Sequence, residues 1–98
     1  MSKQEMFDDA VEALDSAVML LLTDVVGDVT SPSIEGRGNV ITGTIYYDGE
    51  HRNICVTLID GETFSLVSGG VTTVHENAQA VATVACAMDD VDIALAAL

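Results

Sequence analysis

The sequence predicts an α+β domain in which helices pack on one face of an antiparallel sheet. Three observations support this class: a helical period of apolar residues near the N-terminus, Asp-Gly dipeptides between alternating segments, and an alanine-rich C-terminal region. The length of 98 residues suits a single domain, residues 1–98. We expect a helix in residues 1–26, the sheet in residues 39–67 and a helical region in residues 73–98.

The N-terminal helix begins at a capping box, because Ser2 is followed three residues later by Glu5. At about 100° per residue, apolar side chains fall on one side of this amphipathic helix and carboxylates on the other. The all-apolar turn Met19–Leu22 predicts that the second half of the helix is buried, and Gly27 is a natural residue to end it. The apolar side contains Phe7, Ala10, Val11, Leu14, Ala17, Val18 and Leu21.

Residues 28–39 are expected to form a loop, because they contain Pro32, the only proline, and a Gly36-Arg37-Gly38 sequence. A Gly-x-Gly pattern also occurs in phosphate-binding loops. Here no strand is expected before it and no Gly-Lys-Ser/Thr follows it, so we interpret it as a flexible turn into the sheet.

A meander of three strands is expected at Val40–Tyr47, Arg52–Ile59 and Thr63–Val67, with Val71–Val74 as a fourth, short strand if the sheet continues. Asp-Gly dipeptides separate the first three strands, and Asp-Gly is a strong hairpin signal because type I′ turns need positive φ at both central residues. Alternation gives one apolar face and one threonine-rich face. The apolar face, expected to carry the helices, contains Ile41, Ile45, Tyr47, Ile54, Val56, Leu58, Phe64 and Leu66.

The C-terminal region is expected to begin with a second capped helix. Thr73 with Glu76 forms another capping box, and the residues after it are rich in alanine. The pattern therefore predicts a helix over Asn77–Met88.

A break in the helical region is expected at Asp89-Asp90. In one unbroken helix, Asp92 would fall on the apolar side. We therefore expect a second, short helix at Val91–Leu98, with Asp90 as its N-cap residue.

The chain is strongly acidic, with 16 Asp and Glu, three Lys and Arg, and a net charge of −13 at pH 7. This exceeds the magnitude of about 2 to 8 that keeps a small domain soluble. Because 49% of the residues are hydrophobic, the chain is expected to fold rather than to be disordered. Its charge argues against direct binding to nucleic acid or to anionic lipid. The polar N-terminus and the short apolar runs predict a cytoplasmic protein without a membrane span.

Motifs for catalysis and metal binding are absent from the sequence. His51, in an expected turn, and His75, at an expected helix start, are interpreted as surface histidines. Cys55 and Cys86 lie in apolar stretches and are expected to be buried free thiols. The Gly-x-Ser-x-Gly elbow, a clustered zinc-ligand set and the EF-hand pattern do not occur. We therefore expect a protein that is not an enzyme and needs no metal and no cofactor.

The most informative surface feature is the acidic stripe, which we define as Glu5, Asp8, Asp9, Glu12 and Asp15. These carboxylates recur about once per turn along roughly 15 Å of helix, with no lysine between them. Three interpretations compete: an ordinary solvated helix face, adaptation to high salt, and recognition of a basic partner surface. The imbalance of the whole chain favours the third, because a solvated face is normally mixed in sign.

A partner with a Lys/Arg-rich, nucleic-acid-binding groove is therefore predicted. Carboxylates would guide its approach, while a few apolar anchors would supply affinity. The predicted partner-binding residues are the acidic stripe together with Asp48 and Glu50 at a hairpin turn. The candidate anchors are Met6, Phe7, Tyr46 and Tyr47, with Phe7 favoured as a core residue.

In its acidic stripe, acidic turns, small size and α+β class, the chain resembles phage-encoded inhibitors of bacterial defence, especially anti-CRISPR proteins. The resemblance covers the general profile of the whole chain rather than a specific motif. It implies an inhibitor in the cytoplasm of the host cell that occupies the nucleic-acid channel of a CRISPR effector complex. Such an inhibitor would block DNA binding as a DNA mimic or by electrostatic occlusion.

Two alternatives to the inhibitor stay open. The profile also resembles the small, acidic, dimeric chaperones of secretion systems, which bind clients through apolar patches. The apolar turn Met19–Leu22 and the aliphatic content of the second sheet face would leave room for a homodimer. The third possibility is a small structural protein adapted to high salt.

Overall fold

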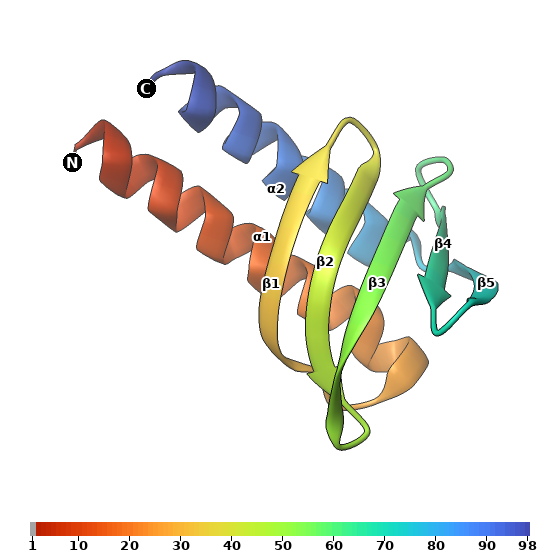
Figure 1. Cartoon of the computed structure of the whole chain (residues 1–98). Helices are drawn as coiled ribbons and strands as arrows, with labels where there is room; N and C mark the ends of the chain where they lie inside the picture. Colours follow the sequence, from red (N-terminus) through yellow and green to blue (C-terminus); the bar gives the residue numbers. More distant parts are fainter. Residues whose placement is uncertain (1) are drawn as a thin grey trace.

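The computed structural model describes residues 2–98, and Met1 lies outside the described residues. Residues 2–98 form two helices and one five-stranded antiparallel sheet, with all strands between the helices in chain order (Figure 1). The elements are α1 Lys3–Val26, β1 Thr30–Arg37, β2 Val40–Tyr47, β3 Glu50–Leu58, β4 Thr63–Ser68, β5 Val71–Glu76 and α2 Ala78–Ala96.

Helix α1 begins and ends where the sequence predicts. The hydroxyl of Ser2, the N-cap residue, accepts a hydrogen bond from the Glu5 N–H at 3.1 Å. At the other end, Gly27 has a φ of 87°, and its N–H donates to the Thr23 carbonyl oxygen at 3.1 Å. Burial is concentrated in the C-terminal part of α1, but the expectation that the whole turn Met19–Leu22 is buried is wrong, because Leu20 is 68% exposed. The buried residues of α1 are Leu14, Ala17, Val18, Leu21 and Leu22.

The prediction of a loop over residues 28–39 is wrong, because Thr30–Arg37 forms β1 and pairs antiparallel with β2. Side chains of β1 alternate between the two sheet faces, with Ile34 half-buried and Glu35 exposed. In the sequence, Pro32 was evidence against a strand, because proline has no backbone N–H to donate to a ladder of hydrogen bonds. However, β1 lies at the edge of the sheet, where a missing N–H is tolerated. The sheet therefore has five strands rather than the three or four expected.

A glycine in β2 allows β1 to approach closely. Gly43 pairs with Ile34 and has a φ of 149°, which other residues rarely adopt. A Cβ atom at this position would clash with the backbone carbonyl oxygen of Ser33 in β1. Gly43 therefore holds the β1–β2 hairpin in its observed shape.

The predicted meander through β2, β3 and β4 is confirmed. Asp48 and Gly49, between β2 and β3, have φ values of 52° and 82°, as a type I′ turn requires. Because β3 starts directly after this turn, His51 lies in a strand rather than in the turn. The short fourth strand expected at Val71–Val74 exists as β5, the fifth strand of the sheet, and extends to Glu76.

The second predicted capping box is wrong, because Thr73 and Glu76 belong to β5. The N-cap residue of α2 is Asn77, whose side-chain oxygen accepts a hydrogen bond from the Ala80 N–H at 3.1 Å. The sheet therefore continues through a segment that carries a helix-start pattern. His75 consequently lies in a strand rather than at a helix start.

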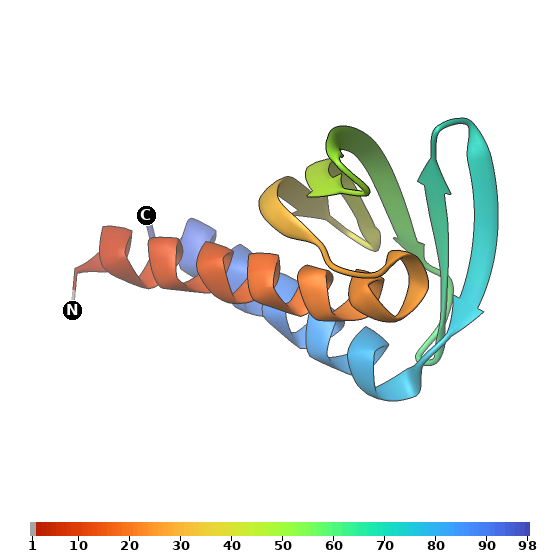
Figure 2. The same ribbon diagram turned by 90° about the horizontal axis from the view of Figure 1, so that it is seen from below.

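The predicted break at Asp89-Asp90 is also wrong, because α2 is continuous from Ala78 to Ala96. The break was expected in order to keep Asp92 out of the core. In the structure Asp92 is exposed within the continuous helix. This part of α2 projects beyond the sheet, so its inner side is not fully covered (Figure 2).

The two helices run antiparallel and pack on one face of the sheet (Figures 1 and 2). The sheet face predicted to carry them is confirmed, since its members are buried except for Tyr47, which is half-buried. Figure 2 shows that the helix pair extends past the sheet, with its N- and C-terminal ends side by side. We call this projecting part the free end of the helix pair. It consists of the first turns of α1, with Met6 and Phe7, and the last turns of α2, with Ile93 and Leu95. The most completely buried large side chains are Phe64, Leu21, Leu22, Ile41, Ile45, Val18, Val56, Val81 and Val84.

Candidate partner-binding surface

Apolar side chains at the free end of the helix pair are unusually exposed. Met6 near the start of α1 is 46% exposed, and Ile93 and Leu95 near the end of α2 are 67% and 55% exposed. Of these residues, Leu95 lines a groove, and an exposed apolar surface around a groove commonly marks an interaction site. This end is therefore the first place to look for a partner.

A groove of about 600 Å³ lies between the free end and the β1–β2 hairpin. Its volume falls within the usual range of ligand-binding clefts. Helix α1 contributes the side chains of Phe7, Val11 and Leu14, and α2 contributes Val91 and Leu95. The remaining wall is the segment 34–38, which ends β1 and begins the turn. The lining is therefore mainly apolar and comes from three separate elements, with Glu35, Arg37 and Asp92 as its charged residues.

A close approach between β1 and the helices closes the inner end of this groove. A Cβ atom on Gly36 would lie 3.1 Å from Met88 Cε and 3.4 Å from Leu14 Cδ2. A larger residue here would push the hairpin away from the helices or displace these side chains. Gly36 thus lets β1 lie close to Leu14 and Met88 beside the groove. From the sequence, this glycine was expected only as part of a turn.

Two members of the acidic stripe, Asp8 and Asp15, flank the groove along α1, whereas Glu5, Asp9 and Glu12 face further from it. Asp8 and Asp15 are three residues before and four residues after Val11, so helical geometry places them next to a lining residue. Four members of the stripe are exposed, and Asp15 is half-buried. Within residues 2–98 no member of the stripe forms an ion pair. Asp8 does accept a hydrogen bond at 3.0 Å from Gln4 Nε2.

Asp15 differs from the other members of the acidic stripe in its burial. Burial raises the pKa of the Asp15 carboxyl above its ordinary value, and the neighbouring charge of Glu12 raises it further. This carboxyl lies where α1 passes from the free end to the part covered by the sheet. It is therefore less suited to meeting a partner than the exposed carboxylates before it.

Acidic residues also border the groove on its other side. Asp92 of α2 lines the groove directly, and Asp89 lies one helical turn before it. Both are exposed, as is Asp90. These residues were not among those predicted to bind the partner. An apolar floor with carboxylates on both helices follows from the continuous α2.

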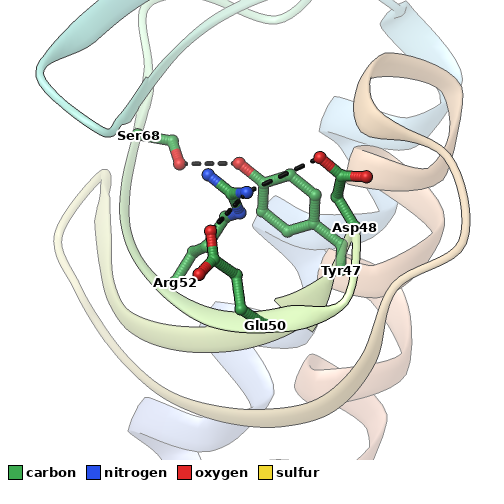
Figure 3. A network of polar contacts seen from close by, with 5 residues as sticks. All are labelled: Tyr47, Asp48, Glu50, Arg52 and Ser68. Atoms are coloured by element: carbon green, nitrogen blue, oxygen red, sulfur yellow. Dashed lines mark hydrogen bonds and ion pairs between the residues drawn. The ribbon is translucent and has the colours of Figure 1, made fainter.

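The predicted residues Asp48 and Glu50 lie elsewhere and share one arginine, which offsets half of their charge. Arg52 Nη2 is 2.6 Å from Glu50 Oε1 and 3.6 Å from Asp48 Oδ2 (Figure 3). Both views of the ribbon place this β2–β3 turn away from the N-terminal end of α1 (Figures 1 and 2). The structure therefore does not bring these two carboxylates together with the acidic stripe.

A polar cluster around Arg52 lies at one end of the sheet's inner face. It consists of Tyr47, Asp48, Glu50, Arg52 and Ser68. The guanidinium carbon of Arg52 lies 5.0 Å from the ring centroid of Tyr47, in a cation–π arrangement. The Tyr47 hydroxyl is hydrogen-bonded to Ser68 Oγ at 2.8 Å, which links β2 to β4 (Figure 3). Half-buried Tyr47 is thus held within the structure. Of the candidate anchors, Met6 and Phe7 lie at the free end, and Phe7 lines the groove rather than the core.

The cysteines and histidines of residues 2–98 lie apart from this groove. Cys55 is half-buried and Cys86 is exposed, so the expectation of two buried thiols is wrong. His51 contacts the ring of Tyr46, and His75 contacts the ring of Phe64. Across residues 2–98, no group of three or more His, Cys, Asp or Glu side chains is placed to hold a metal ion.

Neither α1 nor α2 has a stretch that is both long and apolar enough to cross a lipid bilayer. Compared with known proteins, the chain matches no family model, no curated protein and no solved structure. The functional argument therefore depends on the geometry of the surface alone.

Proposed function

We propose that this protein is a non-enzymatic inhibitor that binds a basic, nucleic-acid-binding surface of a partner protein and keeps nucleic acid from it. The proposed contact surface is the free end of the helix pair, with its acidic stripe and apolar groove. This is the mode of action implied by the resemblance to anti-CRISPR proteins. One observation carries the proposal: Asp8, Asp15 and Asp92, which form no ion pair in the described chain, border an exposed, mainly apolar groove.

The carboxylates supply the attraction to a basic partner. Glu5, Asp8, Asp9 and Glu12 are exposed and lie along successive turns of one helix. A row of like charges repels itself, so its approach to a row of Lys and Arg is favourable. Such complementarity mainly raises the association rate and fixes the orientation of the complex.

The groove supplies affinity that charge alone would not. Phe7, Val11 and Leu95 present apolar surface that would leave water when a partner residue is inserted. Binding energy in protein interfaces is commonly concentrated in a few such apolar contacts surrounded by polar residues. The arrangement of an apolar floor between carboxylates matches this pattern. It also favours a partner segment with both apolar and basic side chains.

A second candidate function is a client-binding chaperone of the secretion type. The exposed apolar groove favours it, because chaperones of that kind bind unfolded segments through apolar patches. The two functions differ in their salt dependence. Binding led by exposed charges weakens as salt rises, whereas apolar client binding does not.

The test begins with capture of bacterial lysate proteins on the immobilised protein, followed by purification of each captured protein. Each one is then mixed with a labelled DNA duplex, and the acidic protein is added. We expect release of the duplex, with an inhibition constant that rises with salt. Captured proteins that bind no nucleic acid, or duplexes that stay bound, would contradict the proposal.

A charge-reversed variant links the effect to the acidic stripe. The variant Asp8→Lys, Asp9→Lys, Glu12→Lys should weaken inhibition by about tenfold or more, because attraction becomes repulsion. The matched control is Asp24→Lys, Asp28→Lys, Glu62→Lys, which makes the same change in net charge at exposed positions elsewhere. Circular dichroism confirms that both variants fold. Equal inhibition by the two variants would show that the position of the charges is irrelevant.

A further inference from the structure

The two edges of the sheet differ in how they are protected from pairing with another strand. Edge strand β1 contains Pro32, which has no N–H to donate. It also has a register shift between Thr30 and Ser33, and it carries the charged residues Glu35 and Arg37. Each of these features discourages a new strand from adding to this edge.

The other edge, β5, lacks the proline and the register shift, and its one charged residue, Glu76, is the last residue of the strand. Its register against β4 is unbroken from Val71 to Glu76, and it contains no proline. Val71 and Val74 are 62% and 61% exposed, so neither sheet face is covered here. A strand of this kind is open to pairing unless something covers it.

The hydrogen-bond pattern shows which backbone groups of β5 are available. The Asn77 N–H donates to the Glu62 carbonyl oxygen at 2.8 Å, next to the pair Thr63 and Glu76. Backbone groups alternate in direction along an antiparallel strand. The N–H and C=O groups of Thr72, Val74 and Glu76 therefore point away from β4.

We propose that β5 pairs with β5 of a second copy of this chain, antiparallel and related by a twofold axis at Thr73. The two five-stranded sheets then become one continuous sheet. In this register Thr72 lies opposite Val74 of the second copy, with their outward backbone groups bonded to each other. Val71 lies opposite His75 of the second copy, and Glu76 lies opposite Gly70 of the second copy. No two carboxylates of β5 face each other.

Charge distribution favours a second copy over a foreign peptide as the occupant. The segment Thr63–His75 contains no Asp, Glu, Lys or Arg, although the chain carries a net charge of −13. A basic peptide would therefore find no carboxylate along most of β5. An identical strand would meet β-branched side chains that pack well across an antiparallel pair. This edge is thus where two acidic copies can approach with the least repulsion.

The proposed dimer is independent of the proposed inhibitory function. In Figure 2, β5 lies at the end of the molecule opposite the free end of the helix pair. Pairing through β5 would leave both acidic stripes uncovered, one at each end of the dimer. Each copy could then engage a partner without disturbing the shared sheet.

Sedimentation equilibrium in buffers of low and high salt tests the proposal. We expect a dimer whose dissociation constant falls as salt rises, because salt screens the repulsion between two acidic chains. This direction is opposite to that expected for partner binding, so failures of the two proposals can be distinguished. A protein that stays monomeric at about 1 mM in high salt would overturn the dimer.

The variant Val74→Lys locates the interface. It adds a charge beside the twofold axis without removing a bond to β4, and it should weaken the dimer by about tenfold or more. The matched control Thr42→Lys adds the same charge to an exposed position of β2, away from the edge, and should stay dimeric. Amide hydrogen exchange of the unsubstituted protein should slow at Thr72 and Val74 as concentration rises. A Val74→Lys dimer of unchanged affinity, or exchange that does not change, would place the interface elsewhere.

Discussion

The covered half of the helix pair and its free end are made of similar residues but have different surroundings. Leu21 and Leu22 in α1 and Val84 in α2 are fully buried beneath the sheet. At the free end, Met6, Ile93 and Leu95 project largely into solvent. The difference comes from the extent of the sheet, which covers only part of the helix length (Figure 2).

The comparison shows that an apolar helix position has no fixed role. Under the sheet an apolar side chain stabilises the fold, because its surface leaves water when the chain folds. At the free end a similar side chain buries little of its apolar surface when the chain folds. It can bury more of that surface when a partner binds. Stability and partner affinity should therefore respond to substitutions in different halves of the same helices.

The largest expected effect is the loss of a buried leucine from the covered half. Leu21→Ala should lower the free energy of unfolding by about 2–5 kcal/mol, because it removes buried surface and leaves a cavity. Urea unfolding followed by circular dichroism measures this change. Leu20→Ala is the matched control on the adjacent position, where the side chain is 68% exposed, and should change stability far less. Equal losses for the two variants would mean that the sheet does not cover α1 as described.

A smaller effect on stability is expected at the free end. Leu95→Ala should lower the free energy of unfolding by about 1 kcal/mol or less, since Leu95 is 55% exposed. The same variant should weaken inhibition in the duplex-release assay more than it weakens the fold, because Leu95 lines the proposed contact groove. A loss of stability as large as that of Leu21→Ala would show that the free end belongs to the core.

Local sequence signals predicted the elements that local chemistry determines. Ser2 with Glu5, and Gly27, marked both ends of α1, because a capping side chain and a positive φ are local requirements. The Asp-Gly dipeptides and strict alternation located β2, β3 and β4. The exposure of the acidic stripe also followed from helical periodicity alone.

The elements that were missed depend on contacts distant in the sequence. Pro32 and Gly36 led to the prediction of a loop where β1 forms. The close approach of β1 to β2 depends on Gly43 in the neighbouring strand. Thr73 with Glu76 satisfied a capping pattern, yet pairing with β4 kept both residues in a strand. The break expected at Asp89-Asp90 assumed that α2 was covered along its whole length. The groove could not be predicted for the same reason, since it depends on where the β1–β2 hairpin ends over the helices.

The smallest expected effect marks the boundary between the two halves. Asp15 is the half-buried member of the acidic stripe. Burial raises the pKa of its carboxyl most, and the nearby charge of Glu12 raises this pKa further. The folded protein therefore binds a proton at this site more readily than the unfolded chain does. The ionised carboxylate costs stability above the raised pKa, and this cost disappears below the ordinary value of 3.8, where both states are protonated.

Asp15→Asn should therefore stabilise the protein at pH 7, by roughly a few tenths of a kcal/mol because solvent still screens a half-buried group. The advantage should shrink as the pH falls and vanish at about pH 3. Paired urea titrations of the variant and the unsubstituted protein at the two pH values measure it. Asp8→Asn, at the exposed free end, is the matched control. It should change the free energy of unfolding less than Asp15→Asn does. If Asp8→Asn stabilised the fold as much as Asp15→Asn, repulsion along the whole stripe rather than burial at the edge of the sheet would be the cause. The boundary between the covered half and the free end would then have to be drawn from other residues.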